Sequence, residues 1–396
     1  MKTLKDFNFK NKKALIRVDF NVPLNDKLEV TDATRIQAAK STIIDVLEQE
    51  GSCILMSHLG RPKGFQDAFS LSHIVEKATE ILGVKVKFVA DCIGDKVAEA
   101  VANLESGEVL LLENLRFYEE EKKGDVAFAE KLSKLGDVYV NDAFGTAHRA
   151  HASTTIIAQF FAENKCFGNL LAREIESIDK VLNNSEKPVL AILGGAKVSS
   201  KITVIENILD KVDHLIIGGG MSFTFIKAQG GKIGNSICED DKMELALDIL
   251  KQAKAKNVQI HIPVDVVAAN AFSNDAQTQI VDVREIPDGW QGLDAGPKSL
   301  EQFKKVILES KTILWNGPVG VFEFASFSHG TEELARGVAA SQAFSLAGGG
   351  DTLAAIDQFG VSDQVSYIST GGGAFLEYVE GKILPAVAIL EERALQ

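Results

Sequence analysis

Short runs of apolar residues, many of them Val, Ile or Leu, recur along the chain and alternate with longer amphipathic stretches. Such runs are typical of strands that are buried on both faces, as in a parallel sheet covered by helices on each side. The first series of runs lies at residues 14–18, 53–56, 84–89, 109–112 and 138–140. The second series lies at residues 189–193, 214–217, 258–262, 312–315, 344–347 and 365–368. The pattern predicts an α/β fold.

The two series indicate two domains rather than one. A chain of 396 residues is too long for a single compact core of ordinary size, and its hydrophobic fraction of 45% is typical of globular proteins. We therefore expect two doubly wound parallel-sheet domains of Rossmann-like architecture, one over residues 1–169 and the other over residues 189–381.

Residues 170–188 separate the two series and carry apolar side chains at helical spacing. These side chains are Leu171, Ile175, Ile178 and Leu182. The spacing predicts an interdomain helix, which we interpret as a hinge, with a simple spacer as the alternative. Residues 382–396 contain a further apolar stretch that predicts a C-terminal helix, and the sequence does not assign that helix to either domain.

The charge and cysteine content exclude several classes of protein. A formal net charge of -13 argues against a general nucleic-acid or anionic-membrane binder, because such proteins need a basic face. Four widely spaced cysteines without a CxxC pair indicate neither a disulfide scaffold nor a structural zinc site. No segment has the roughly 20 apolar residues of a membrane span, and no apolar leader follows the N-terminus. We expect a cytoplasmic protein that acts as a monomer.

Polar residues follow the apolar runs of the first series. In open parallel sheets ligands bind beyond the carboxyl ends of the strands, so residues at these positions are candidate ligands. They include Asp19, Asn21, His58, Arg61, Asn114, Arg116 and Arg149, with Arg35 shortly after the first run. A guanidinium group can bind phosphate or carboxylate through two hydrogen bonds. A single arginine is as often an ordinary surface residue, but the shared location favours a site for a small, highly charged anion.

Glycine-rich loops follow runs of the second series. They are GGAKVSSK at 194–201, GGGM at 218–221, GGGDT at 348–352 and TGGGA at 370–374. Glycine lets the backbone approach a phosphate closely, and a helix that begins there presents free N–H groups. Asp351 stands where a carboxylate can bind nucleotide-bound Mg²⁺, and Thr352 can donate to a phosphate or cap the next helix. A lone glycine triplet is more often a turn, but the repetition predicts a nucleotide site.

Two common nucleotide motifs are nevertheless absent. Phe223 and Leu353 stand where a dinucleotide fingerprint requires Gly or Ala, and no Gly-Lys pair is followed by Ser or Thr as in Walker A. The missing fingerprint counts against a nicotinamide-dependent dehydrogenase, which only the doubly wound architecture favours. A noncatalytic nucleotide-binding protein of the same fold is the other alternative.

The motifs together closely resemble the phosphoglycerate kinase family over nearly the whole chain. The segments that carry the resemblance are RVDFNVP (17–23), SHLGRP (57–62), ENLRF (113–117), NDAFGTAHRAHAS (141–153), LGGAKVSSKI (193–202), GGGMSFTF (218–225), WNGPVGVFE (315–323), AGGGDT (347–352) and STGGGAFLEYVEG (369–381). Ser200 departs from the family pattern, which usually has an acidic residue between the two lysines.

The resemblance implies two sets of binding residues. Those for 3-phosphoglycerate are Asp19, Asn21, Arg35, His58, Leu59, Gly60, Arg61, Arg116 and Arg149. Those for ADP or ATP are Gly195, Ala196, Lys197, Lys201, Gly220, Gly296, Asn316, Pro318, Gly320, Val321, Glu323, Gly349, Gly350, Asp351 and Thr352. In this set Glu323 would bind the ribose hydroxyls and Asp351 the Mg²⁺ ion.

The implied reaction is reversible phosphoryl transfer between 1,3-bisphosphoglycerate and ADP, giving 3-phosphoglycerate and ATP. It needs no catalytic base, because both acceptor groups are already ionised near neutral pH, so the protein must align the reactants and neutralise charge. We expect Arg35, Lys201, Mg²⁺ and the amides of Gly371, Gly372 and Gly373 to surround the transferring phosphoryl group, with Lys197 nearby. The two domains must then close on each other around the substrates.

Overall fold

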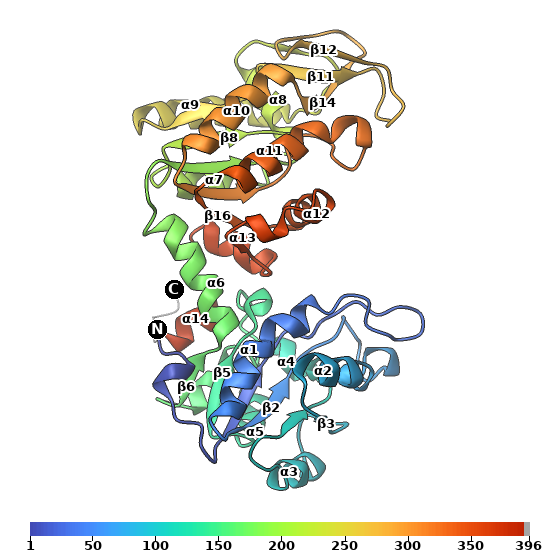
Figure 1. Cartoon of the computed structure of the whole chain (residues 1–396), viewed down its shortest axis with the longest axis vertical. Helices are drawn as coiled ribbons and strands as arrows, with labels where there is room; N and C mark the ends of the chain where they lie inside the picture. Colours follow the sequence, from blue (N-terminus) through green and yellow to red (C-terminus); the bar gives the residue numbers. More distant parts are fainter. Residues whose placement is uncertain (392–396) are drawn as a thin grey trace. The chain divides into compact units, whose positions relative to one another are not determined.

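The computed structural model describes residues 1–391, and its contacts divide the chain into two units (Figure 1). The first unit contains Met1–Glu176 together with the segment from Ile383 onward. The second contains Ser177–Lys382. Each unit has a six-stranded sheet and a hydrophobic core of its own.

Six parallel strands form the sheet of the first unit, in the order β3-β4-β2-β1-β5-β6. They are β1 (Lys13–Arg17), β2 (Ser52–Met56), β3 (Val86–Phe88), β4 (Val109–Leu111), β5 (Val138–Asn141) and β6 (Lys165–Phe167). Every residue of β2 is buried, as expected for a strand covered on both faces. Strand β6 was not predicted, because it has only three residues and begins with a lysine.

Helices cover this sheet. They are α1 (Thr34–Glu48), α2 (Val75–Leu82), α3 (Asp95–Ala102), α4 (Glu119–Lys123) and α5 (Val126–Ser133). Helix α1 places Ile36, Ile43 and Val46 in the core, a spacing that keeps one helical face toward the sheet. This packing fixes the N-terminus of α1, which carries Arg35, beside the end of β1.

Helix α6 (Asn169–Leu182) begins in the first unit, and the division between the units falls within it. Its first backbone amides are bound by groups that lie far away in the sequence. The amide of Asn169 donates to Thr42 Oγ1 at 2.8 Å, and that of Leu170 donates to Asp142 Oδ1 at 2.9 Å. The N-terminus of α6 is therefore held by α1 and by the residue that follows β5.

The described part of the C-terminal segment belongs to the first unit. Helix α14 (Pro385–Leu390) packs against β6, and the amide of Ala386 donates to the carbonyl of Ala147 at 3.1 Å. This contact answers a question that the sequence left open for residues 383–391, while residues 392–396 of the predicted helix lie outside the described residues.

The main sheet of the second unit also has six parallel strands, in the order β10-β8-β7-β15-β16-β17. They are β7 (Val189–Leu193), β8 (His214–Ile217), β10 (Gln259–His261), β15 (Thr312–Asn316), β16 (Phe344–Ala347) and β17 (Tyr367–Ile368). The helices are α7 (Ile202–Ile208), α8 (Met221–Ala228), α9 (Met243–Ala255), α10 (Pro297–Glu309), α11 (His329–Ala340), α12 (Gly350–Gln358) and α13 (Gly373–Val379). Helices α10 and α11 pack side by side (Figure 1).

The second unit contains two small sheets that the apolar runs did not predict. Strands β11 (Asp265–Ala269), β12 (Thr278–Asp282) and β14 (Gln291–Ala295) form an antiparallel sheet, and β9 (Lys232–Ile233) pairs with β13 (Glu285–Ile286). Most of β12 is exposed, so it has no apolar run. Residues of β11 and β14 line a cavity of this unit, which is described below.

The fold class predicted from the sequence is confirmed, since both main sheets are parallel and sequential strands are joined through helices. Across residues 1–391, none of the helices combines the length and the apolar character needed to span a membrane.

Candidate active site

In the first unit, an ion pair links the end of β1 to the start of α1. Arg35 is the second residue of α1, and its Nη1 lies 2.9 Å from Oδ2 of Asp19. The Asp19 carboxylate is largely buried, whereas the Arg35 side chain is partly exposed. Asp19 therefore orients the guanidinium group while leaving part of it available to a ligand.

The loop after β2 is fixed by hydrogen bonds to its backbone. The amide of Gly60 donates to Asn21 Oδ1 at 2.8 Å, and Arg116 Nη1 donates to the Gly60 carbonyl at 2.7 Å. Asn114 Nδ2 donates to the carbonyl of Leu59 at 2.7 Å. Gly60 has a φ of +61°, and a Cβ there would lie 2.3 Å from the ring of Phe69, so only glycine fits. These contacts bring together residues from the ends of β1, β2 and β4.

The cationic groups of this region differ in their exposure. Arg116 is mostly buried, and its burial together with the nearby Arg17 and Arg149 lowers its pKa to about 10. Arg61 and Arg149 are exposed, and Arg149 Nε donates to His148 Nε2 at 3.0 Å. His58 is buried, and burial and then Arg17 lower its pKa well below the ordinary value. A neutral His58 adds no further positive charge beside Arg17.

Arg17 is the residue of this region that the sequence reasoning missed. It ends β1 and is only 1% exposed. Its Nε donates to Ser153 Oγ at 2.8 Å, and Ser153 Oγ donates to Oε1 of the buried Glu121 at 2.6 Å. Arg17 Nη2 also lies 3.2 Å from His58 Nδ1. Arg17 was overlooked because it lies within an apolar run, and no local pattern reveals its partners.

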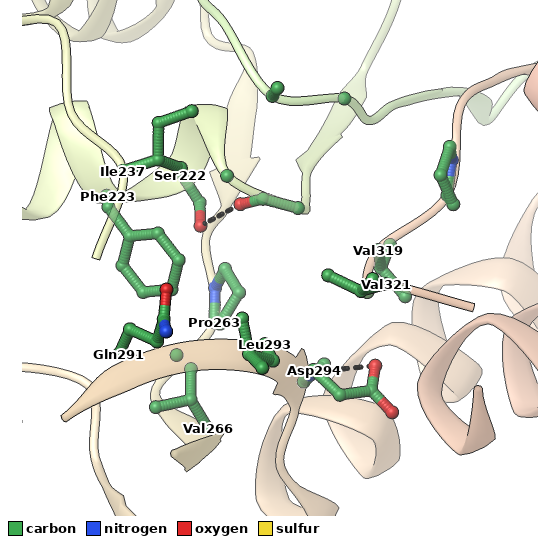
Figure 2. Close-up of a pocket in the computed structure, with 18 of the residues that line it drawn as sticks. Ser222, Phe223, Ile237, Pro263, Val266, Gln291, Leu293, Asp294, Val319 and Val321 are labelled. Carbon is green, nitrogen blue, oxygen red and sulfur yellow. Dashed lines mark hydrogen bonds between the residues drawn. The ribbon is translucent and has the colours of Figure 1, made fainter. Parts of the chain in front are cut away.

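In the second unit, a cavity of about 430 Å³ lies at the strand ends of the main sheet, within the size range of small-molecule sites. The predicted nucleotide residues that line it are Gly195, Ala196, Gly220, Pro318, Gly320, Val321, Glu323 and Asp351. Figure 2 shows Phe223 and Ile237 on one side of this cavity and Val319 and Val321 on the other. The apolar wall that includes Phe223, Ile237, Pro263, Val266 and Leu293 was not predicted, because these residues come from segments that no local motif connects.

The other predicted nucleotide residues lie outside the lining of this cavity. They are Lys197, Lys201, Gly296, Asn316, Gly349, Gly350 and Thr352. Gly296 precedes α10, and its amide donates to the Asp265 carbonyl at 2.9 Å. Thr352 is buried, and its hydroxyl accepts from the amide of Gly317 at 2.8 Å, so it stabilises the loop after β15. Gly349 has a φ of +93° and approaches Asn316 so closely that a Cβ would lie 2.4 Å from Nδ2.

Lys201 and Asn316 are in direct contact. The amine of Lys201 donates to Asn316 Oδ1, while Asn316 Nδ2 donates to the Gly348 carbonyl at 2.6 Å. Burial lowers the pKa of Lys201, and the carboxylates of Asp351 and Glu380 oppose that shift. Asn316 thus ties the Lys201 amine to the glycine-rich loop after β16.

The remaining predicted residues are mostly exposed. Lys197, Asp351, Gly372 and Gly373 are exposed, and Gly371 is buried, with its amide donating to Ser369 Oγ at 3.2 Å. Ser200, which departs from the family pattern, donates its hydroxyl to the Lys197 carbonyl at 2.8 Å. Asp351 lies in the first turn of α12 and on the edge of the cavity.

A buried carboxylate forms part of the cavity wall. Asp294 accepts from the amide of Ala295 at 2.9 Å through Oδ1 and from the amide of Gly330 at 2.8 Å through Oδ2. Burial nevertheless raises its pKa to about 7. Between the ordinary value of 3.8 and about 7, the folded protein holds a proton that the unfolded chain has released. The stability contributed by this group is therefore full below 3.8 and is lost as the pH rises through about 7.

We expect Asp294→Asn to remove this titration. The difference in unfolding free energy between the parent protein and the variant should decrease as the pH rises from 4 to 7, with a slope of at most about 1.4 kcal/mol per pH unit. Denaturant unfolding of both proteins at several pH values measures it. A difference that stays constant over this range would contradict the raised pKa of Asp294.

Comparison with known proteins gives a consistent result. A family model described as phosphoglycerate kinase matches residues 4–382. The chain is 51% identical to phosphoglycerate kinase of Porphyromonas gingivalis, with 98% of this chain and 100% of that protein covered. It is 50% identical to the cytosolic phosphoglycerate kinase of Triticum aestivum, with 98% of each chain covered. The solved structure of phosphoglycerate kinase from Coxiella burnetii has a TM-score of 0.93 at 42% identity, with 99% of each chain covered.

One α/β unit gathers arginines near the ends of its strands and the other has a glycine-lined cavity, an arrangement that suits a small-molecule kinase. The chain belongs to the phosphoglycerate kinase family. The resemblance inferred from the motifs is thereby confirmed, and so is the enzyme class, a phosphotransferase that acts on the carboxyl group of 3-phosphoglycerate in glycolysis.

Proposed function

We propose that this chain catalyses Mg²⁺-dependent, reversible transfer of a phosphoryl group between 1,3-bisphosphoglycerate and ADP, with 3-phosphoglycerate and ATP as products. The observation that carries the proposal is the chemistry of the two units of this family member. One gathers guanidinium, imidazole and amide groups at the ends of β1, β2 and β4, and the other has a glycine-lined cavity with a carboxylate at its edge. The first set suits a small acid and the second suits a nucleotide.

In the first unit, the acid would be bound by several different kinds of group. Arg35, Arg61, Arg116 and Arg149 would share its phosphate and carboxylate, and a neutral His58 would donate one hydrogen bond without adding charge. Asp19 and Asn21 act by orienting Arg35 and Gly60. Because Arg116 is mostly buried, we expect its guanidinium group to keep the same position with and without the ligand. Arg61 and Arg149 are exposed, so their side chains are available to adjust to the ligand.

In the second unit, Glu323 would accept from the ribose hydroxyls, and the glycine amides near Gly195, Gly220 and Gly350 would donate to phosphates. The carboxylate of Asp351 fits Mg²⁺, because this ion is usually held by one or two carboxylates together with substrate phosphates. Asp351 is exposed in the first turn of α12 at the cavity edge, where such phosphates would lie. Bound Mg²⁺ would supply neutralisation of phosphate charge.

Side chains and backbone amides of the chain would align the reactants and neutralise the remaining charge. The attacking carboxylate or ADP phosphate is already ionised, so the transfer requires alignment and charge neutralisation rather than proton abstraction. Lys201 and Arg35, with the amides of Gly371 to Gly373, would neutralise the oxygens of the transferring phosphoryl group, and Lys197 would assist nearby. The contact between Lys201 and Asn316 would position the Lys201 amine for this role.

A coupled assay with ATP, Mg²⁺ and 3-phosphoglycerate tests the activity. We expect turnover that requires all three components. Reduction or oxidation of nicotinamide without the coupling enzyme would instead support a dehydrogenase, and nucleotide binding without turnover would support a noncatalytic protein.

We also propose that the two units close on each other when both substrates bind, by bending near residues 170–188. The acid and the nucleotide are assigned to different units, so their reacting atoms must be brought together, and closure would also exclude water from the acyl phosphate. We expect small-angle scattering to show a smaller radius of gyration with 3-phosphoglycerate and a nonhydrolysable ATP analogue together than with either alone. An unchanged radius in the ternary sample would refute closure.

We also propose a cellular location and an oligomeric state for this protein. A cytosolic location is supported by the cytosolic relative from Triticum aestivum, although the relative from Volvox carteri is chloroplastic. We propose a monomer with no nucleic-acid or membrane partner, in line with the net charge of -13.

A further inference from the structure

The cavity of the second unit has an apolar end where a nucleobase would lie. This inference rests on the proposed function, in which the phosphates lie at the glycine loops and Asp351. The lining also contains the apolar side chains of Phe223, Ile237, Pro263 and Leu293. An aromatic base is the part of a nucleotide that gains from contact with such side chains.

Two glycines determine the position of this apolar wall. A Cβ at Gly292 would lie 2.4 Å from Cζ of Phe223, and a Cβ at Gly220 would lie 2.5 Å from Cγ2 of Ile237. Both side chains therefore pack directly on backbone that only glycine leaves accessible. This packing holds the two side chains against the backbone, so a base seated on the wall would meet the same side chains each time it binds.

Most polar side chains of the lining already have partners in the protein. Ser222 Oγ donates to the Gly219 carbonyl at 2.7 Å, and the Asp294 carboxylate accepts from two backbone amides. Glu323 and Asp351 are carboxylates suited to the ribose and to Mg²⁺. The side chain that remains is Gln291.

Gln291 begins β14 and pairs with Ala269 of β11. Its side chain is partly exposed, and within residues 1–391 its amide forms no hydrogen bond. Figure 2 shows this amide directed into the cavity on the side where Phe223 lies. Gln291 thus offers one donor group and one acceptor beside the apolar wall.

We infer that Gln291 reads the substituent at position 6 of a bound purine base and so determines the nucleotide preference of the enzyme. Its Oε1 accepts from the 6-amino group of adenine. When the amide turns over, its Nε2 donates to the 6-carbonyl of guanine or hypoxanthine. Glutamine can satisfy either substituent, so the parent protein discriminates weakly among purine nucleotides.

Charged replacements that keep only one half of the amide test this assignment. Gln291→Glu can only accept, and Gln291→Lys can only donate. Calorimetry measures the dissociation constants of ADP, GDP and IDP without the acid substrate. We expect Gln291→Glu to shift the preference toward ADP by about threefold to tenfold, and Gln291→Lys to shift it toward GDP and IDP by a similar factor.

Ratios of dissociation constants separate recognition of the substituent at position 6 from the effect of the added charge and from recognition of position 2. The added charge changes the affinity of every diphosphate alike and cancels in the ratio. IDP lacks the 2-amino group of GDP, so a shift seen with GDP but not with IDP would assign Gln291 to position 2 and overturn the inference. Gln279→Glu and Gln279→Lys, on the exposed face of β12, are the matched controls and should leave the ratios unchanged.

Ratios that are unchanged in both folded Gln291 variants would also overturn the inference. The outcome is independent of the proposed reaction, because binding is measured without turnover. If the parent protein is inactive but the two Gln291 variants shift the nucleotide preference in opposite directions, the proposed function is refuted and the role of Gln291 stands. If the parent protein is active but the variants leave the preference unchanged, the proposed function stands and the role of Gln291 is refuted.

Discussion

Replacing Lys201 with Ala is expected to lower kcat by about 10²-fold to 10³-fold while changing the KM for 3-phosphoglycerate little. The physical reason is the position of the amine. Lys201 is partly buried and its amine donates to Asn316 Oδ1 beside the glycine-rich loop after β16, where its charge is less screened by water than at the open surface. In the role that we propose, this amine would act on the charge that develops during phosphoryl transfer rather than on the bound acid.

Steady-state kinetics in both directions measures this effect, with ATP and 3-phosphoglycerate varied separately. Lys251→Ala provides a matched control, because Lys251 is an exposed lysine of α9 in the same unit. Thermal unfolding of each variant establishes that the loss is not one of folding. A kcat for Lys201→Ala within threefold of the parent would show that Lys201 does not contact the transferring group.

Replacing Arg17 with Met is expected to destabilise the first unit by about 3–5 kcal/mol. Arg17 and Glu121 are both almost fully buried and are joined through the Ser153 hydroxyl. Burial raises the pKa of Glu121, and the charge of Arg17 opposes that shift. Without Arg17 the folded-state pKa of Glu121 would rise further, so its charged form becomes more costly, and the destabilisation should diminish at acidic pH where Glu121 is protonated.

Hydrogen exchange at β1 and β5 reports this loss locally, since the chain has two units whose unfolding need not be a single transition. Arg173→Met, at an exposed arginine of α6, is the control. The double variant Arg17→Met/Glu121→Gln removes both charges and should recover part of the stability. If the double variant is no more stable than Arg17→Met, the two charges are not coupled as we infer.

Apolar runs predicted the six parallel strands of the second main sheet. Central strands such as Val189–Leu193 are buried throughout, whereas the edge strands β10 and β17 are only partly buried. The same runs also predicted the strand-end loops, since polar and glycine residues directly follow them. The predicted strand boundaries were less accurate where the strand is short. The run at 84–89, for example, contains only Val86–Phe88 as strand.

The elements that were missed share a cause. Strand β6 begins with Lys165, and β12 exposes most of its residues, so neither has the composition of a buried strand. Their existence depends on pairing with β5 and with β11. Such pairing joins segments across the chain and leaves no local period in the sequence.

The sequence by itself determined the α/β class, the division of polar chemistry into an arginine half and a glycine half, and the family. Each of these conclusions depends on short segments alone, because the types of residue and their distance from a strand end are sufficient to draw it. Only the tertiary structure decided that Arg17, Ser153 and Glu121 form one buried network, and that Ala386 places the C-terminal helix in the first unit. It also decided that Gln291 lies beside Phe223 in the cavity lining. The reason is physical: burial and hydrogen bonding between distant residues depend on how the sheets pack, and packing is a property of the whole unit rather than of any one segment.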